Sequence, residues 1–79
     1  MQKNMITSLV AQLHHASDEA ATSIRRICEH SACEVGERVE DRLPIIVEAD
    51  NPAGLESVHR WIRNLSGVVH TDVVFVFLG

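Results

Sequence analysis

The sequence predicts one small α+β domain with the element order β-α-β-β-α-β. The chain has 79 residues, enough for a single core, and its 46% hydrophobic content is that of a globular protein. Two segments carry apolar residues at helical spacing. Four others are rich in branched residues or alternate between apolar and polar ones, which is typical of strands. We therefore treat residues 1–79 as one domain.

A strand and a helix are predicted in the first third of the chain. Met5–Leu13 is rich in branched residues and partly alternates, which favours a strand. Ser17 is a suitable helix N-cap, and the two acidic residues after it suit the positive end of the helix dipole. The apolar face of this helix is predicted to comprise Ala20, Ile24, Ile27 and Cys28.

Two further strands are predicted in the middle of the chain. Cys33–Val39 alternates between apolar and polar residues, and Leu43–Ala49 is rich in branched ones. The polar stretch Glu40–Arg42 predicts the turn between them. Pro44 has no N–H to donate, so we expect it at the start of its strand or facing away from a partner.

The second helix has the clearest start signal. Asn51 is a good N-cap and Pro52 suits the first helical position. Gly67 is the expected stop, and Val68–Leu78 is the predicted last strand. The apolar face of this helix is predicted to comprise Leu55, Val58, Ile62 and Leu65.

This order of elements is the ferredoxin-like pattern. Right-handed crossovers place both helices on one face of a four-stranded antiparallel sheet and leave the other face bare. Alternation along the strands, with Glu48, His70 and Asp72 taken to face water, assigns residues to the bare face. A mixed surface of this kind fits a protein-binding site, although ordinary β-formers explain it equally well. The candidate binding residues are Ile6, Ser8, Val10, Glu34, Ile46, Glu48, Asp72, Val74 and Val76, with Val68 placed on the same side.

The charge balance limits the classes of partner. Seven basic against eleven acidic residues give a net charge of −4, which disfavours nucleic acid and favours a cationic partner. The longest apolar run, Val73–Leu78, is far short of the ~20 residues that span a bilayer. Met1–Leu13 does not resemble a signal peptide. We therefore expect a cytoplasmic protein that does not insert into membranes.

The sequence offers little chemistry for catalysis. It has no glycine-rich phosphate loop and no recognisable Ser/His/Asp set. Cys28 and Cys33, with His30 between them, could ligate a soft metal, but their spacing is not that of a zinc motif. We predict reduced, structural cysteines, and no catalytic residue, cofactor or metal site.

Several short segments spread along the chain resemble one family. They are Ser8-Leu9-Val10, Cys33-Glu34-Val35, Ile46-Val47-Glu48-Ala49, Leu65-Ser66-Gly67-Val68 and Val73-Val74-Phe75. In order and spacing they resemble the NapD-type assembly chaperones of periplasmic nitrate reductase. Members often have Pro-Gly where this chain has Ser31-Ala32, and Tyr at the position of Phe75.

The resemblance implies a cytoplasmic chaperone without a cofactor. Such proteins bind the twin-arginine signal peptide of the nitrate reductase catalytic subunit and delay its export until the molybdenum cofactor is inserted. The peptide docks on the bare face of the sheet. On this basis Glu34, Glu48 and Asp72 are expected to attract the arginines. The apolar segment is expected to dock on Val10, Ile46, Val74 and Val76.

Three alternatives share the fold. An ACT-type regulatory domain would bind a small molecule. A heavy-metal carrier normally has a Cys-x-x-Cys pair where His14-His15 stands here. An acylphosphatase needs an anion-binding loop and an arginine near the first strand, and the sequence shows neither. The exposed sheet edges also allow a homodimer.

Overall fold

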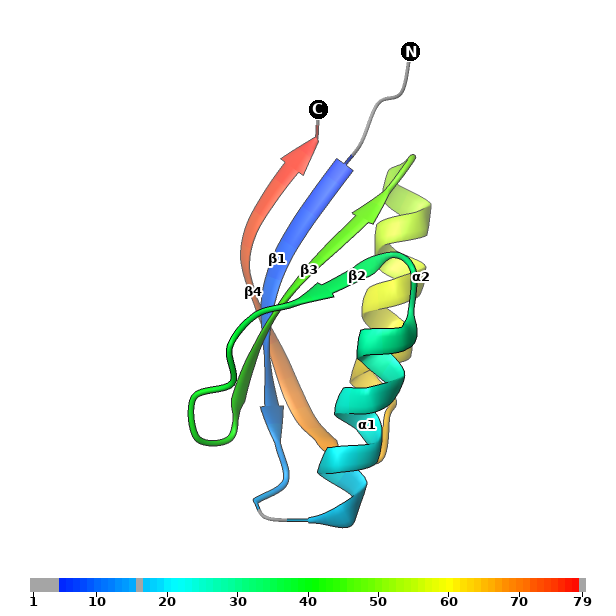
Figure 1. The fold of residues 1–79 in the computed structure, drawn as a ribbon. Helices are drawn as coiled ribbons and strands as arrows, with labels where there is room; N and C mark the ends of the chain where they lie inside the picture. The colour runs from blue at the N-terminus through cyan, green and yellow to red at the C-terminus, as the bar shows by residue number, and fades with distance from the viewer. Residues whose placement is uncertain (1–4, 16, 79) are drawn as a thin grey trace.

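The predicted order of elements is confirmed by the computed structural model, which describes residues 5–15 and 17–78 (Figure 1). The elements are β1 (Met5–Leu13), α1 (Asp18–Glu29), β2 (Cys33–Val35), β3 (Arg42–Ala49), α2 (Pro52–Arg63) and β4 (Val68–Leu78). The strands form one antiparallel sheet in the order β2-β3-β1-β4. Both helices cover the same face, as a ferredoxin-like fold requires. Residues 1–4, which entered the expectation about a signal peptide, lie outside the described part.

Both helices begin where their capping residues predict. The Ser17 hydroxyl accepts a hydrogen bond from the backbone N–H of Ala20 at 3.0 Å. The Asn51 side-chain carbonyl accepts one from the N–H of Gly54 at 2.7 Å, and Pro52 occupies the first turn. Each cap satisfies a donor that the first helical turn leaves without an intrahelical partner.

The core lies between the helices and one face of the sheet. Alternate residues of β1 and β3 are buried against the apolar stripes of α1 and α2. Trp61 packs at the margin of this core, with its ring centroid 4.8 Å from that of His30. The largest fully buried side chains are Leu9, Leu13, Ile27, Leu43, Ile45, Val47 and Ile62.

The prediction that Cys28 belongs to the apolar face of α1 was wrong. The buried residues of that helix are Ala20, Ser23 and Ile27, whereas Cys28 is exposed. At 3.6 residues per turn, Cys28 lies about 100° around the helix from Ile27. A stripe centred on Ile27 therefore leaves Cys28 at its edge, on the side of the solvent.

Strand β2 is shorter than predicted because of Pro44. The strand ends at Val35, although the sequence alternates as far as Val39. The N–H of Gly36 still donates to the Pro44 carbonyl at 2.9 Å, but Pro44 has no N–H with which to continue the ladder. The chain then forms a loop that closes at a bridge between Val39 and Arg42.

The connection from α2 to β4 touches α1 at Gly67. The buried backbone N–H of Gly67 donates a hydrogen bond to the Ser23 hydroxyl at 2.9 Å. A Cβ atom on Gly67 would lie 2.6 Å from the Cα of Ala20, closer than packed atoms approach. Glycine is therefore required here for close approach between two backbones.

Candidate functional site

The sheet has one face that the helices leave bare. In β1, Thr7, Leu9, Ala11 and Leu13 are buried, so the alternate side chains point the other way. The same alternation in β3 places Ile46 and Glu48 on the bare face, and both are exposed. Glu34 of β2 pairs with Ile46 and is also exposed. The predicted orientation of β1, β2 and β3 is thus confirmed.

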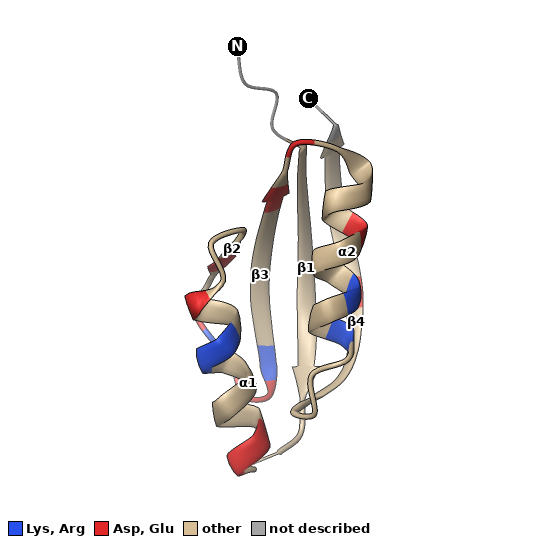
Figure 2. Cartoon of the chain, turned by 90° about the vertical axis from the view of Figure 1, so that its right-hand side faces the viewer, with Lys and Arg blue, Asp and Glu red and all other residues tan. Residues whose placement is uncertain are grey.

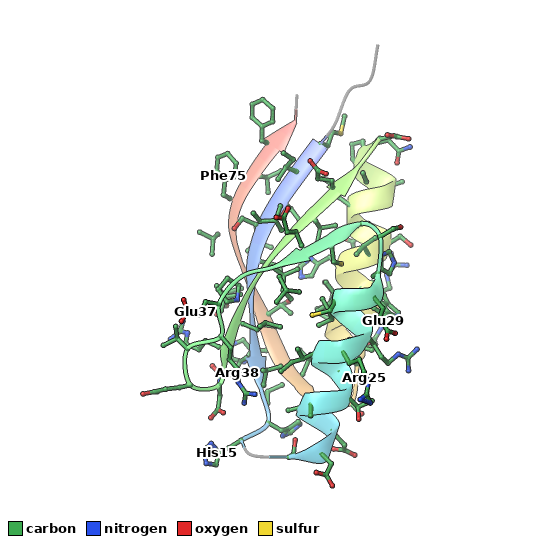
Figure 3. The ribbon with its side chains drawn as sticks, in the orientation of Figure 1. His15, Arg25, Glu29, Glu37, Arg38 and Phe75 are labelled. Carbon is green, nitrogen blue, oxygen red and sulfur yellow. The ribbon has the colours of Figure 1, made fainter. Side chains whose placement is uncertain are left out.

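The predicted orientation of β4 was wrong over its second half. Val76 lies opposite Thr7 of β1, and Thr7 belongs to the helix side of the sheet. Phe75 lies opposite Ser8 and Phe77 opposite Ile6, so the two phenylalanines occupy the bare face where valines were expected. Figure 3 shows the Phe75 ring pointing away from the helices.

A β-bulge causes this change of orientation. Ser8 pairs with Phe75 while Leu9 pairs with Val73, so Val74 is an extra residue without a partner in β1. One extra residue moves every side chain that follows it in the strand to the opposite face of the sheet. The prediction continued the alternation of His70 and Asp72 past the bulge at Val74, and it therefore placed Val76 on the bare face. It also placed Val68 on the bare face, but a second shift beside Leu13 turns Val68 into the core, where it is 6% exposed.

Cross-strand pairing arranges the bare face in rows. One row runs from Glu48 through Ile6 to Phe77. The next row contains Glu34, Ile46, Ser8 and Phe75. Because neighbouring strands lie about 4.8 Å apart, each row spans about 10 Å from β3 to β4. We call this surface the two-row patch. It has carboxylates at one side and phenyl rings at the other, with Ile6, Ile46 and Ser8 between them.

The acidic side of the patch is hollowed. A pocket of about 240 Å³ is lined by Ser31, Ala32, Cys33, Glu34, Ile46 and Glu48. Figure 2 shows the acidic positions of β2 and β3 as red segments on neighbouring strands. Within residues 5–15 and 17–78, neither Glu34 nor Glu48 forms an ion pair. Two carboxylates beside one pocket are suited to a guanidinium group, which donates several hydrogen bonds in a planar fork.

Asp72 does not join the other two carboxylates. It lies on β4 opposite Val10, one row beyond Ser8 and Phe75. Its carboxylate is 3.4 Å from Nε2 of His70, and both side chains are more than half exposed. The three carboxylates predicted to act together therefore divide into a pair, Glu34 and Glu48, and a separate Asp72.

The two phenylalanines on the aromatic side of the patch are not among the residues predicted from the sequence to bind a partner. The exposed fractions of Phe75 and Phe77 are 53% and 51%, high values for large apolar residues. A signal was present, because Val73–Leu78 is uniformly apolar and does not alternate as a half-buried strand should. Such a run has no intrinsic orientation, so either set of side chains could have been the exposed one.

The loop after β2 projects on the bare side of the sheet, opposite the helices (Figures 1 and 3). Nε of Arg38 donates to the Glu40 carbonyl at 2.7 Å, and its guanidinium is 3.4 Å from the Asp41 carboxylate. Asp41 also contacts Nδ1 of His15 at 2.9 Å. These contacts join the loop to the end of β1, so it lies beside the bare face in a defined position.

The cysteines occupy different environments. Cys33 is partly buried, and burial raises the pKa of its thiol to about 11. Cys28 is exposed. Among the residues that the structure describes, no cluster of three or more His, Cys, Asp and Glu side chains is placed to hold a metal ion. In the same part of the chain, no helix is long and apolar enough to cross a membrane.

The fold and the patch together define a ferredoxin-like domain with a bare, partly apolar and acidic sheet face. A solved structure similar to this chain is that of the E. coli Tat proofreading chaperone protein NapD. The match has a TM-score of 0.80 and 26% sequence identity, and covers 95% of this chain and 80% of the other. It confirms the resemblance to NapD-type chaperones. No family model matches the chain, and no curated protein matches it either.

Proposed function

We propose that this protein is a Tat proofreading chaperone that binds a twin-arginine signal peptide on the two-row patch. The observation that carries the proposal is the pairing of Glu34 and Glu48 at one pocket, beside an exposed apolar surface. A twin-arginine peptide has the complementary order, with two guanidinium groups followed by an apolar segment. The similarity to NapD over nearly the whole chain supports the same conclusion.

The arginines are assigned to Glu34 and Glu48. A charged hydrogen bond contributes about 1.5–3 kcal/mol, and exposed ion pairs contribute less and weaken with salt. Both carboxylates are solvent-exposed, so their main effects are on association rate and on selection of a basic peptide. Asp72, one row away and close to His70, is assigned a weaker role.

The apolar segment of the peptide is assigned to the aliphatic and aromatic part of the patch. Ile6, Ile46, Phe75 and Phe77 form a continuous surface across β3, β1 and β4. Ser8 lies within this surface, between Ile46 and Phe75, and Val10 borders it along β1. Val74, 66% exposed at the bulge, lies beside it, whereas Val76 no longer belongs to the proposed site.

The client and the timing follow from the family resemblance. We propose the catalytic subunit of a periplasmic nitrate reductase as the client, held in the cytoplasm until its molybdenum cofactor has been inserted. The chaperone itself needs no cofactor for this role. Its contribution is to cover the signal peptide and so to withhold it from the export machinery.

Isothermal titration with a synthetic twin-arginine signal peptide from such a subunit tests the proposal. We expect saturable binding that weakens strongly when the arginine pair becomes Lys-Lys, because lysine cannot form the planar fork. Glu34→Gln and Glu48→Gln should each weaken binding, more so at low salt than at high salt. Glu29→Gln is the matched control, since Glu29 is exposed on α1, on the opposite side of the sheet from the patch (Figure 3). Absence of binding, or equal affinity for the Lys-Lys peptide, would refute the proposal.

A further inference from the structure

Strand β4 forms one edge of the sheet and is exposed on both of its faces. Val73 and Val76 lie on the helix side, opposite Leu9 and Thr7, and each is 50% exposed. Phe75 and Phe77 on the bare side are exposed to a similar degree. The common cause is the absence of a neighbouring strand beyond β4.

A ligand on the bare face does not account for this exposure. It would cover Phe75 and Phe77 but leave the two valines in water, because they point to the other side of the sheet. A strand paired to the edge of β4 would cover the two valines and the two phenylalanines at once, since its own side chains alternate between the two faces of the sheet.

The helix side of this edge has a groove that would receive such side chains. It has a volume of about 310 Å³ and lies between α2 and β4. Its lining is mostly apolar and comprises Thr7, Pro52, Leu55, Glu56, His59, Val73 and Val76.

The two edges of the sheet differ in their protection against pairing. Strand β2, at the other edge, has only three residues, and the chain turns away after Gly36. Short strands, charges, prolines and β-bulges are the usual ways in which sheet edges avoid association. The stretch Val73–Phe77 has no charge and no proline, and beyond the bulge at Val74 the residues Phe75–Phe77 continue the regular pairing with β1.

We propose that β4 pairs with β4 of a second copy of this chain to form an antiparallel dimer with a continuous eight-stranded sheet. A partner strand must be apolar on both faces and uncharged, and Phe75–Phe77 itself meets this requirement. Antiparallel pairing makes the contact self-complementary, as a twofold dimer demands. His70 and Asp72 remain outside the paired segment.

The orientation of the side chains along β4 determines the register of the proposed strand pair. With the twofold axis at Val76, Val76 meets Val76 on the helix side, and Phe75 of each copy meets Phe77 of the other on the bare side. The pair of valines and the two Phe75–Phe77 pairs then each join side chains that point to the same face. An axis at Phe75 would instead pair Val73 with Phe77, which lie on opposite faces.

Sedimentation equilibrium over a range of concentrations tests this dimer. The mass should rise from 8.8 kDa toward twice that value. Because each copy carries a net charge of −4, added salt should strengthen the association, whereas it weakens binding of a basic peptide. Val76→Lys should remain monomeric at every concentration. Val39→Lys, at a valine 62% exposed in the loop after β2, should dimerise like the unmodified chain.

A disulfide test checks the register and does not rely on a disruptive substitution. Val76→Cys, with Cys28 and Cys33 changed to Ser, should form a covalent dimer on mild oxidation, because residues facing each other across antiparallel strands are about 4.5–5.5 Å apart at Cα. Val74→Cys is the control: its two copies would lie about 13 Å apart along the strands and should not cross-link.

Several outcomes would overturn the dimer. One is a monomer at high protein concentration and high salt, and another is a Val76→Lys variant that still associates. The dimer does not depend on the proposed function, because association is measured without any peptide.

Discussion

The hydroxyl of Thr7 donates a hydrogen bond to the backbone carbonyl of Phe75 at 3.2 Å. Thr7 is 5% exposed on the helix side of β1, and the bulge at Val74 follows directly in the β4 ladder. A bulge disrupts the regular backbone pairing, and a side-chain donor compensates for part of what is lost. This contact ties the bulge to β1 and thereby fixes which face Phe75 occupies.

Thr7→Val should test that contact, because valine keeps the shape of threonine and removes only the donor. We expect a loss of about 0.5–1.5 kcal/mol in the free energy of unfolding, the usual net contribution of one hydrogen bond. Urea unfolding measures it. Thr22→Val, at an exposed position of α1, is the control and should change stability much less. Equal effects at the two positions would mean that the hydroxyl of Thr7 does not stabilise the bulge.

Phe75→Ser and Phe77→Ser should each weaken binding of the twin-arginine peptide. Complete burial of a phenylalanine contributes about 1.5–3 kcal/mol, and these rings are about half exposed, so each should cost about fivefold to tenfold in affinity. Val76→Ser should have a smaller effect, since Val76 is on the helix side. If Val76→Ser matched the two phenylalanine variants in titration calorimetry, the assignment of the bare face to the peptide would fail.

Gly67→Ala should lower the free energy of unfolding by about 1–3 kcal/mol. The added methyl group would meet the backbone of α1 at Ala20, and a shift of side chains cannot relieve that contact. The hydrogen bond from Gly67 to Ser23 would be strained as well. Thermal unfolding measures the loss. Ser66→Ala, at the exposed neighbouring position, serves as the control and should leave the midpoint nearly unchanged.

His59 should make stability depend on pH. Burial, followed by the nearby positive charge of Arg63, lowers the pKa of His59 below its usual 6.5, although Glu56 opposes the shift. The unfolded chain therefore takes up a proton at a higher pH than the folded one. This contribution to stability is fully present above about pH 6.5 and is lost as the pH falls toward the lower folded pKa.

The His59→Gln variant isolates this effect. Its midpoint of thermal unfolding should fall less between pH 7.5 and pH 5 than that of the unmodified chain. In the folded protein, the ring nitrogen Nε2 of His59 lies 2.7 Å from the Thr71 hydroxyl. An unchanged pH dependence in the variant would show that His59 is not responsible.

The two cysteines should react with thiol reagents at very different rates. The thiolate is the reactive form, and burial raises the pKa of Cys33 to about 11, so little thiolate is present at neutral pH. Cys28 is exposed. Mass spectrometry after brief iodoacetamide treatment should find modification at Cys28 first. Faster labelling of Cys33 would contradict the environment described for it.

The fold could be predicted largely because its signals are local. Ser17 and Asn51 cap their helices through contacts three residues away, so the surrounding sequence contains everything needed to recognise them. The prediction failed at Cys28, which lies at the margin of an apolar stripe. It also failed after Val35, where the end of β2 depends on a proline nine residues further along.

The sequence by itself determined the order of the elements, the bare face of the sheet and the position of Glu34 and Glu48 on it. These follow from alternation and from local start and stop signals, which act over a few residues. Only the tertiary structure decided that Phe75 and Phe77, and not Val76, share that face. The physical reason is that a bulge is a property of two paired strands. The uniformly apolar stretch Val73–Phe77 has no preferred face of its own, and its pairing with β1, held at Thr7, selects one.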